Sequence, residues 1–556
     1  MSFLNKKWKI LNEDKNLPLI KRLLINRGIT NETEEENFFS NNYSFHDPFL
    51  FKDMDKAVER IAKAIKNNER IMIFGDYDVD GISGSAILIH TLRKLNANVS
   101  YRLPSRQKDG YGLQNHFIEE FKNLKVKLVI TVDNGIACKE PIDLAKSLDI
   151  DVIVTDHHGL PENFPDQAYA IIHPRQQDCQ YPFKDLAGAG VAFKLAQALL
   201  KSLKIKEAED FIEDLFDLAC LGTIADCTSL THENRAIVKK GLKKLQNSKW
   251  KGLNLIKKKA GIESMTDNDT YVVGFKIGPR INAAGRIDNP YYALQALLDE
   301  NGKAEKFVNK LEQLNSQRQQ ITDKALKYLE ANFEDVLKNE DICILNHKDW
   351  PSGIIGLLAG KISEKYGKPA FIMEDRGGIL IGSVRCPEYF DAFEAITHTK
   401  QYLEHFGGHQ QAAGYSIKKE NLAQFTQALK TFAKEKIAGK DTNPILEIDT
   451  IIDAKNLNLE TVALINTFAP YGVGNKKPMF ILENVNLQNL KKVGSEGKHL
   501  SLNTVCQNQV IKSIAFSFGQ FFEKITSDKH YNIVCHLSSN KWNNYEKLEL
   551  QIIDLT

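Results

Sequence analysis

Residues 71–81 read Ile-Met-Ile-Phe-Gly-Asp-Tyr-Asp-Val-Asp-Gly and decide the fold of the region around them. Four apolar residues in a row are typical of a strand that is buried on both faces, as in parallel sheets. The glycine after them permits a tight turn, and residues 85–95 have the pattern of a helix. If the turn stays extended, Asp76, Asp78 and Asp80 point to the same side, because side chains alternate along an extended chain.

The same strand-and-helix pattern continues along the chain to about residue 175. Apolar runs at 127–132, 151–155 and 170–172 alternate with predicted helices such as 141–148. This alternation predicts βαβ units and a parallel sheet, and ligands of such sheets bind beyond the carboxyl ends of the strands. The second run leads into Asp133-Asn-Gly and the third into Asp156-His157-His158-Gly. We therefore expect carboxylates and imidazoles from three strands to meet at one edge of the sheet.

These side chains together predict a metal centre. Converging carboxylates repel one another and raise one another's pKa unless a cation neutralises them. Oxygen-rich ligation with one or two imidazoles suits Mn²⁺ or Mg²⁺, and this many carboxylates can hold two ions about 3.5–4 Å apart. Taken alone, the acidic turn could be solvated or bind calcium, and a further candidate, Asp226, could be a helix cap. The combination predicts a two-metal phosphoesterase.

The composition of the 556-residue chain limits the remaining possibilities. The formal net charge is +2, so any binding of a polyanion has to come from local patches. Eight cysteines are scattered without a CxxC pair, which argues against a zinc module or a disulfide framework and fits a reducing compartment. The first residues lack the apolar run of a signal peptide, and no apolar stretch is long enough to span a bilayer. We expect a cytoplasmic protein without a membrane partner.

The pattern predicts five parts of the chain. Residues 1–50 are an N-terminal extension that packs on the next domain along the chain, and residues 51–300 are an α/β domain with a helical part, interrupted by the Gly-Pro-rich segment 278–285. Residues 301–340 form one long connecting helix, although Arg318 interrupts its apolar stripe. A second α/β pattern covers 341–440, and after a linker at 440–444 the short strands of 441–556 predict a small β-barrel.

Four motifs stand in the order and spacing of the DHH phosphoesterase superfamily, which this sequence resembles. They are Asp-Tyr-Asp-Val-Asp-Gly at 76–81, Val-Asp-Asn-Gly at 132–135, Asp-His-His at 156–158 and Thr-Ile-Ala-Asp at 223–226. Segments 278–286, 351–356 and 407–414 resemble the bacterial single-strand-specific DNA exonucleases of that superfamily. The resemblance implies two α/β lobes, a DHH parallel-sheet domain and a DHH-associated domain, joined by the long helix. It also implies a C-terminal all-β OB-fold barrel that binds nucleic acid.

The resemblance also assigns roles to individual residues. The metal ligands would be Asp76, Asp78, Asp80, Asp133, His157 and Asp226. Asp133 would bridge two divalent ions, Mn²⁺ or Mg²⁺. Asp156 would orient the ring of His157, and His158 would face the scissile phosphate as a ligand or proton donor.

A second set of residues would bind the substrate. Arg106, Ser383 and Arg385 correspond to a 5′-phosphate pocket, although Val384 and Cys386 stand where the family has glycine and serine. Arg280 and Arg286 would contact the backbone, and His409 would lie beside the glycines of 407–414. In the barrel, lysines 476, 477, 491, 492 and 498 and the aromatic residues Tyr471, Phe480 and Trp542 are candidates for binding a single strand.

The activity implied by the resemblance is 5′-to-3′ exonuclease activity on single-stranded DNA, releasing 5′-mononucleotides, in DNA repair and recombination. A single-strand-binding protein, a helicase or mismatch-repair factors would be partners, and we expect a monomer. One alternative is a phosphodiesterase of the same superfamily that acts on short oligonucleotides or cyclic dinucleotides. Another is a non-catalytic scaffold that binds single-stranded DNA.

Overall fold

The computed structural model describes residues 2–40, 43, 45–106, 109–110, 112–266, 268–299, 302–507, 509–542 and 545–556, without the side chain of Trp542. The chain divides into two compact units, one of residues 44–442 and one of residues 1–43 together with 443–556. The division falls inside the predicted linker. No helix in the described part of the chain combines the length and the apolar character needed to cross a membrane.

The first lobe of the 44–442 unit contains a five-stranded parallel sheet in the order β3-β2-β4-β5-β6. Its strands are β2 (Arg70–Gly75), β3 (Val99–Arg102), β4 (Val126–Val132), β5 (Asp151–Thr155) and β6 (Ala170–Ile172). Alternate residues of β2 face opposite sides: Ile71 and Ile73 pack in one core, and Met72 and Phe74 in another. This alternation buries both faces of the sheet, as the continuous apolar runs predict.

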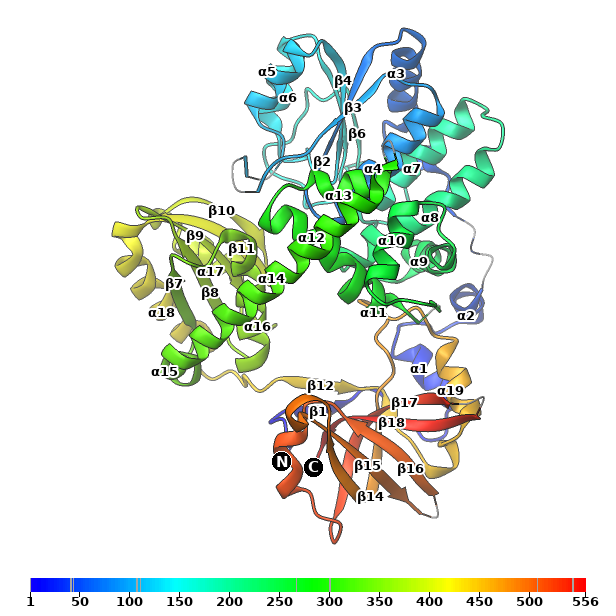
Figure 1. The fold of residues 1–556 in the computed structure, drawn as a ribbon, viewed down its shortest axis with the longest axis vertical. Coiled ribbons are helices and arrows are strands. Elements are labelled where there is room, and N and C mark those ends of the chain that lie inside the picture. Colours follow the sequence, from blue (N-terminus) through cyan, green and yellow to red (C-terminus); the bar gives the residue numbers. More distant parts are fainter. Residues whose placement is uncertain are drawn as a thin grey trace. The chain divides into compact units, whose positions relative to one another are not determined.

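Helices cover both faces of this sheet (Figure 1). On one side lie α5 (Asn115–Asn123) and α6 (Lys139–Ser147), and on the other α3 (Met54–Lys66), α4 (Val79–Lys94) and α7 (Gly188–Ser202). The helical part continues with α8 (Ala208–Ala225), α9 (His232–Gln246), α10 (Lys251–Lys259), α11 (Thr270–Val272), the π-helix η2 (Val273–Ile277), α12 (Gly278–Ile287) and α13 (Tyr291–Leu298). The Gly-Pro-rich segment 278–285 therefore does not interrupt the helices as expected. It forms most of α12, because proline is tolerated in the first turn of a helix.

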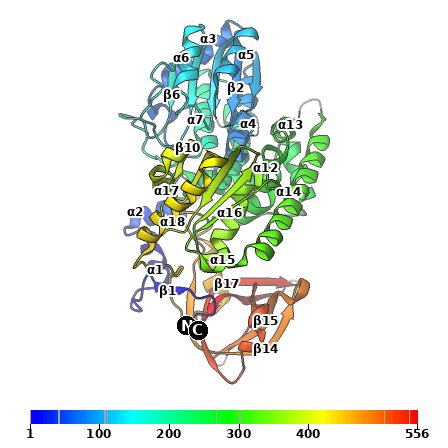
Figure 2. The same cartoon turned by 90° about the vertical axis from the view of Figure 1, so that its left-hand side faces the viewer.

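A 29-residue helix, α14 (Ala304–Asn332), joins the two lobes, and the short α15 (Glu334–Asn339) comes after it. In its first half Val308, Leu311 and Leu314 pack in the core of the first lobe, whereas Ala325 and Leu329 pack in the core of the second. Figures 1 and 2 show α14 passing beside α12 and α16. The predicted connecting helix is thus confirmed.

The second lobe is built on a mixed sheet in the order β10-β11-β9-β8-β7. Its elements are β7 (Cys343–His347), α16 (Ser352–Tyr366), β8 (Ala370–Asp375), β9 (Ile379–Arg385), α17 (Ala392–His398), β10 (Leu403–His409), β11 (Ala412–Lys418) and α18 (Leu422–Ile437). Only β7 and β8 are parallel to each other. Helix α16 shares one core with this sheet, and α17 and α18 share the other.

The second unit is a closed β-barrel to which the N-terminal residues belong. The strands run β14-β15-β16-β18-β17, and pairing of β17 with β14 closes the barrel. They are β14 (Phe480–Val493), β15 (His499–Cys506), β16 (Gln509–Ala515), β17 (His530–Trp542) and β18 (Tyr545–Leu555), with β12 (Ile445–Ile448), β13 (Thr450–Ile451) and α19 (Leu459–Asn466) before them. The predicted OB-fold is confirmed.

The N-terminal segment packs on this barrel, whereas we had expected it to pack on the next domain along the chain. Strand β1 (Lys7–Ile10) pairs in parallel with β12, and α1 (Leu19–Ile25) and α2 (Glu32–Phe39) come after it. Leu23 and Leu24 of α1 are buried in the barrel core, and Trp8 donates a 2.9 Å hydrogen bond from Nε1 to the buried Asp554. The barrel that buries these apolar residues lies more than 400 residues away in the sequence, so the local pattern of the N-terminal residues does not predict this packing.

Candidate metal centre

The carboxyl ends of three neighbouring strands bring acidic side chains to one edge of the first sheet. β2, β4 and β5 are parallel, and their last residues are aligned with one another. The residue after each strand is an aspartate, Asp76, Asp133 or Asp156, and each of the three is at most 5% exposed. The strand register therefore confirms the edge that the sequence predicts.

The acidic turn after β2 does not stay extended. Helix α4 already begins at Val79, so Asp78 is its N-cap residue and accepts a 3.1 Å hydrogen bond from the amide of Gly81. Asp80 lies in the first helical turn. Carboxylates are favoured at this position because they satisfy free amides and interact with the helix dipole. The acidic side chains thus converge through a turn and a helix start, and not through strand alternation.

Glycines let two further helices approach these carboxylates closely. Asp80 accepts hydrogen bonds of 2.6 and 2.8 Å from the amides of the first two residues of α7. A Cβ atom on Gly188 of α7 would lie 2.6 Å from Oδ1 of Asp133, and one on Gly222 of α8 would lie 2.3 Å from Oδ1 of Asp80. This close approach places the C-cap residue of α8, Asp226, at the same edge.

His157 lies at the centre of the acidic side chains. Its Nε2 atom is 3.1 Å from Oδ1 of Asp133 and 3.7 Å from a carboxylate oxygen of both Asp80 and Asp226. Among the described residues, donor atoms gather within 4.8 Å of one another in three groups: Asp133-His157-His158, Asp80-His157-Asp226 and Asp76-Asp78-Asp133. Asp133 and His157 each belong to two of these groups, and the role of Asp133 as a bridge between two ions stays a prediction.

The carboxylates of this cluster repel one another, and a bound cation would relieve that repulsion. Burial, and then the charge of Asp78, raise the pKa of Asp76 to about 8 and that of Asp80 to about 7. Burial and the neighbouring carboxylates likewise raise the pKa of Asp133 well above its ordinary value and that of Asp226 to about 8. Burial lowers the pKa of His157 to about 3, so its imidazole is neutral and can bind a metal ion.

The residues present fit two divalent ions. Oδ1 of Asp76 and Nε2 of His157 are buried and have no hydrogen-bond partner among the residues that the structure describes. Buried polar atoms without partners are costly unless another ligand satisfies them. Five carboxylates and one imidazole form a donor set for Mn²⁺ or Mg²⁺ rather than for structural zinc.

Asp156 holds the ring of His158, and not that of His157 as we had expected. Oδ1 of Asp156 lies 2.8 Å from Nδ1 of His158 and accepts the amides of His157 (2.7 Å) and His158 (3.1 Å), while Oδ2 accepts the amide of Ile136 (3.0 Å). Although burial opposes both shifts, this pairing raises the pKa of His158 to about 9 and lowers that of Asp156 to about 2. His158 is therefore a cation beside the metal ligands, held by a carboxylate that does not belong to the donor groups.

Three of the predicted substrate-binding arginines converge in one half-buried positive site. Burial, followed by the charges of Arg106 and Arg318, lowers the pKa of Arg286 to about 10, and burial and Arg106 also lower that of Arg385. Arg106 lies over the ring of Tyr77 (4.4 Å), and its buried Nε has no hydrogen-bond partner in the described part of the chain. Guanidinium groups that repel one another in a half-buried site are stabilised by an anion, and a phosphate matches them in shape.

The side-chain alternation of β9 separates the predicted phosphate-binding residues from the two departures from the family motif. Ser383 and Arg385 lie on one face, where Nη1 of Arg385 donates to Oγ of Ser383 (3.2 Å). Val384 and Cys386 point into the core on the other face, and the thiol of Cys386 contacts the carbonyl of Phe390 (3.0 Å). Both substitutions therefore lie on the face of β9 that turns away from the arginines.

The other two predicted substrate-binding residues, Arg280 and His409, make no hydrogen bond or ion pair with the site formed by the three arginines in the part of the chain that the structure describes. Arg280 donates two hydrogen bonds, of 2.7 and 3.2 Å, to the carboxylate of Glu312 on α14. His409 is exposed at the end of β10. Their predicted roles in substrate binding rest on the motif alone.

Arg318 is a candidate residue that the sequence interpretation missed. It lies on α14, its charge acts on Arg286, and its buried Nε lacks a hydrogen-bond partner among the described residues. Nη2 donates to Oδ1 of Asn315 (3.0 Å). The interruption of the apolar stripe was the available signal, because placing a charged side chain among apolar positions of a helix costs free energy unless a partner compensates it.

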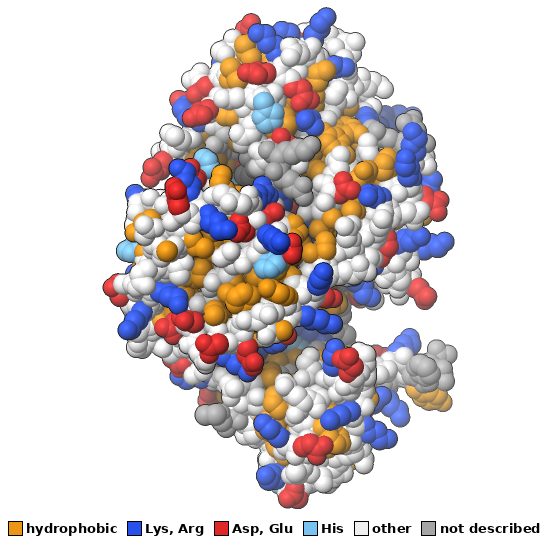
Figure 3. Space-filling model, turned by 60° about the vertical axis from the view of Figure 1, so that its left-hand side comes forward, with side chains coloured by type: hydrophobic (Ala, Val, Ile, Leu, Met, Phe, Trp, Pro, Cys, Tyr) orange, Lys and Arg blue, Asp and Glu red, His pale blue; other side chains and the backbone are white. Residues whose placement is uncertain are grey.

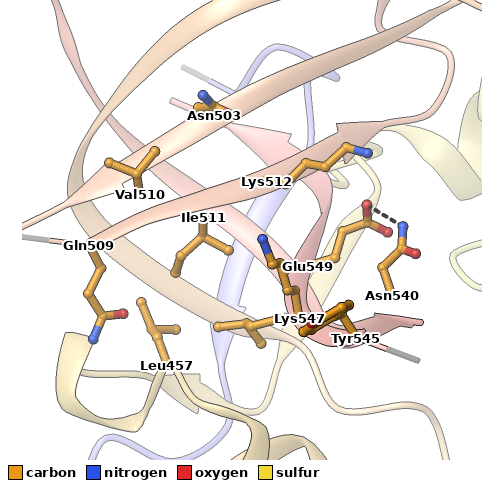
Figure 4. A pocket seen from close by; sticks show the side chains of 11 residues that line it. Leu457, Asn503, Gln509, Val510, Ile511, Lys512, Asn540, Tyr545, Lys547 and Glu549 are labelled. Carbon is orange, nitrogen blue, oxygen red and sulfur yellow. Dashed lines mark hydrogen bonds between the residues drawn. The ribbon is translucent and has the colours of Figure 1, made fainter. Parts of the chain in front are cut away.

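The barrel has a groove of its own, about 1110 Å³ in volume, which Figure 4 shows. Lys512 and Lys547 line it together with the exposed Val510 and Tyr545. The aromatic residues that we had named lie elsewhere: Phe480 is fully buried and Tyr471 packs against the barrel core. The side chain of Trp542 is outside the described part. Basic and aromatic side chains together are typical of single-strand binding, and here strands far apart in sequence supply them.

The rest of the surface shows no comparable concentration of charge on the face drawn in Figure 3. Lys and Arg side chains are interspersed there with Asp and Glu. This mixture agrees with the net charge of +2.

Comparisons with known proteins agree with this architecture. The DHH family, N-terminal domain, matches residues 70–223, the DHHA1 domain matches 339–435, and the RecJ OB domain matches 448–554. The fold and the site thus define a metal-dependent phosphoesterase of the DHH class.

Curated relatives and solved structures cover nearly the whole chain. The single-stranded-DNA-specific exonuclease RecJ of Bacillus subtilis is 36% identical over 99% of this chain and 69% of its own length, and that of Haemophilus influenzae is 32% identical over 97% and 96%. The crystal structure of RecJ in complex with Mn²⁺ from Thermus thermophilus superposes with a TM-score of 0.84, at 27% identity, over 99% of this chain and 80% of that one. The chain belongs to the RecJ family.

Proposed function

We propose that this protein is a two-metal exonuclease that removes 5′-mononucleotides from the 5′ end of single-stranded DNA. The observation that carries the proposal is the arrangement of two sites in one unit. A donor set for two divalent ions lies at the carboxyl edge of the first sheet, and Arg106, from the loop after β3, connects it with Arg286 and Arg385. A metal centre beside a half-buried anion site suits a substrate that ends in a phosphate.

The side chains of the protein position and neutralise the reacting groups. Arg106, Arg385 and Ser383 would bind the terminal 5′-phosphate and so place the first phosphodiester at the metal centre. The His158 cation, held by Asp156, would stabilise negative charge on the scissile phosphate. Two bound Mn²⁺ or Mg²⁺ ions would supply an acidified water and stabilise the charge of the transition state. The ligands Asp76, Asp78, Asp80, Asp133, His157 and Asp226 would hold them.

The cellular setting is inferred from this activity. Single-stranded DNA is the substrate, and the protein would act in the cytoplasm during DNA repair and recombination. A single-strand-binding protein, a helicase or mismatch-repair factors would supply or protect the strand. The barrel groove would hold the strand, with Lys512 and Lys547 at its phosphates and Tyr545 against its bases.

A time course on 3′-labelled oligonucleotides tests the proposal. The substrates are a long strand, single-stranded or in a duplex, with or without a 5′-phosphate, incubated with Mn²⁺ or with EDTA. We expect a ladder that shortens from the 5′ end, only on the single strand, faster with the phosphate and absent in EDTA. An intact long strand together with rapid dinucleotide cleavage would replace this proposal with the small-substrate phosphodiesterase.

A further inference from the structure

Two aromatic side chains stand exposed on the segment before α12. Among the large apolar residues that the structure describes in the 44–442 unit, Phe275 (69% exposed) and Tyr271 (63%) are the most exposed. Their rings stack on each other, with centroids 4.7 Å apart and planes 20° apart. Adjacent exposed aromatic side chains are disfavoured in water and mark surfaces that bind a partner.

The same segment packs on the metal-binding loops with its other face. Tyr271 lies in α11 and Phe275 in the π-helix η2, a distortion that is frequent at functional sites. A Cβ atom on Gly274 would lie 3.7 Å from Ile224, and one on Gly278 would lie 3.9 Å from both Ala225 and Val79. Ala225 directly precedes the ligand Asp226, and Val79 stands between Asp78 and Asp80. The two rings are therefore about one helix diameter, ~10 Å, from the metal-binding segments.

A lysine side chain stands beside the two rings. Lys276 is exposed next to Phe275, and no ion pair joins it to an acid in the described part of the chain. Of the acidic residues nearby in sequence that the structure describes, Asp269 accepts a hydrogen bond from Oγ1 of Thr266 (2.9 Å), and Glu263 is exposed. Stacked rings beside a free cation are the combination that binds single-stranded nucleic acid without sequence preference.

We propose that Tyr271 and Phe275 form a platform on which bases of the single strand stack as it leaves the metal centre, with Lys276 at a neighbouring phosphate. This inference rests on the proposed function and adds a contact to it. A separation of ~10 Å from the metal-binding segments places the platform within a few nucleotides of the scissile bond. Continuity with the metal-binding segments favours a strand over a protein partner, because the strand has to leave the centre past one of the surfaces that adjoin it.

Steady-state kinetics with Mn²⁺ on three substrates test this proposal. The substrates are a 20-nucleotide single strand, the same strand with an abasic tract over nucleotides 3–8, and a dinucleotide. The variants are Tyr271→Ala, Phe275→Ala and the conservative Tyr271→Phe. Leu124→Ala is the control, because Leu124 is an exposed apolar residue at the opposite, amino-terminal edge of the sheet.

We expect either alanine variant to raise KM for the 20-nucleotide strand about tenfold, since one stacked base contributes 1–3 kcal/mol by alanine substitution. On the abasic strand the KM of the wild type should rise by the same factor, and the alanine variants should show no further rise above the wild type. Tyr271→Phe, Leu124→Ala and all rates on the dinucleotide should stay at the wild-type level. The proposal is overturned if the alanine variants have the wild-type KM on the 20-nucleotide strand. It is also overturned if they raise KM relative to the wild type by the same factor on the abasic strand as on the intact strand. Failure of the proposed function looks different: the wild type itself would leave the long strand intact.

Discussion

Two buried aspartates of the metal centre should change the stability of the metal-free protein in opposite directions. Asp226→Asn removes one of several carboxylates that repel one another, and it should raise the melting temperature at pH 8 in EDTA. Asp156→Asn removes a carboxylate that accepts hydrogen bonds from three amides and the His158 ring, and it should lower the melting temperature. Both substitutions preserve the shape of the side chain, so they report on charge.

The pKa values set the signs and the size of these effects. The pKa of Asp226 is raised to about 8, so folding is opposed by its ionisation as the pH rises from about 4 to about 8. At about 1.4 kcal/mol per pKa unit the ceiling is about 6 kcal/mol, and we expect about 2 kcal/mol because other carboxylates share the repulsion. The pKa of Asp156 is lowered to about 2, so it contributes stability above pH 4 that is lost as the pH falls through 2, about 2.5 kcal/mol in all.

Differential scanning calorimetry of the metal-free proteins at pH 8 and pH 5 measures both effects. For a unit of this size 1 kcal/mol corresponds to roughly 1 °C, so shifts of about +2 and −2 °C are expected at pH 8. At pH 5 the gain of Asp226→Asn should shrink. Mn²⁺ should stabilise the wild type more than Asp226→Asn. Asp349→Asn, whose side chain is 74% exposed, serves as the control. An Asp226→Asn protein that melts no higher than the wild type at pH 8 would refute the view that the carboxylates repel one another.

Three further predictions concern the geometry of the first lobe. Asp133→Ala should reduce hydrolysis more than a hundredfold while single-strand binding, measured by fluorescence anisotropy, persists; an active variant would contradict the metal assignment. Gly188→Ala places a methyl group 2.6 Å from Oδ1 of Asp133 and should weaken Mn²⁺ binding in calorimetric titration, whereas Gly360→Ala, with open space around its Cβ, should not; equal affinities would show that the contact yields freely. Burial raises the pKa of Asp217 to about 7, so the wild type should lose up to about 1.4 kcal/mol of stability per pH unit between pH 4 and 7 from this group. Denaturation of Asp217→Asn should show a shallower dependence, and parallel curves would argue against a titrating Asp217.

The sequence was sufficient for those features that depend on neighbours along the chain. Apolar runs gave the strands β2, β4 and β5, and the residues after each run gave the acidic edge, because parallel strands end together. The spacing of apolar residues likewise gave α14. The turn after β2 was predicted less well, since the N-cap position of Asp78 depends on where α4 begins.

Side-chain directions and contacts between distant segments were decided only in the tertiary structure. That Asp156 holds His158, that Arg318 is a half-buried cation acting on Arg286, and that Val384 turns away from the pocket all depend on side-chain direction and packing. The same is true of the N-terminal residues, which pack on the barrel formed at the other end of the chain. The local sequence pattern predicts which polar residues lie at the end of each strand, because the periodicity of apolar residues extends over only a few positions. Which side chains finally meet depends on how helices separated by about a hundred residues or more pack, and single positions such as Gly188 and Gly222 permit that approach through the absence of a Cβ atom.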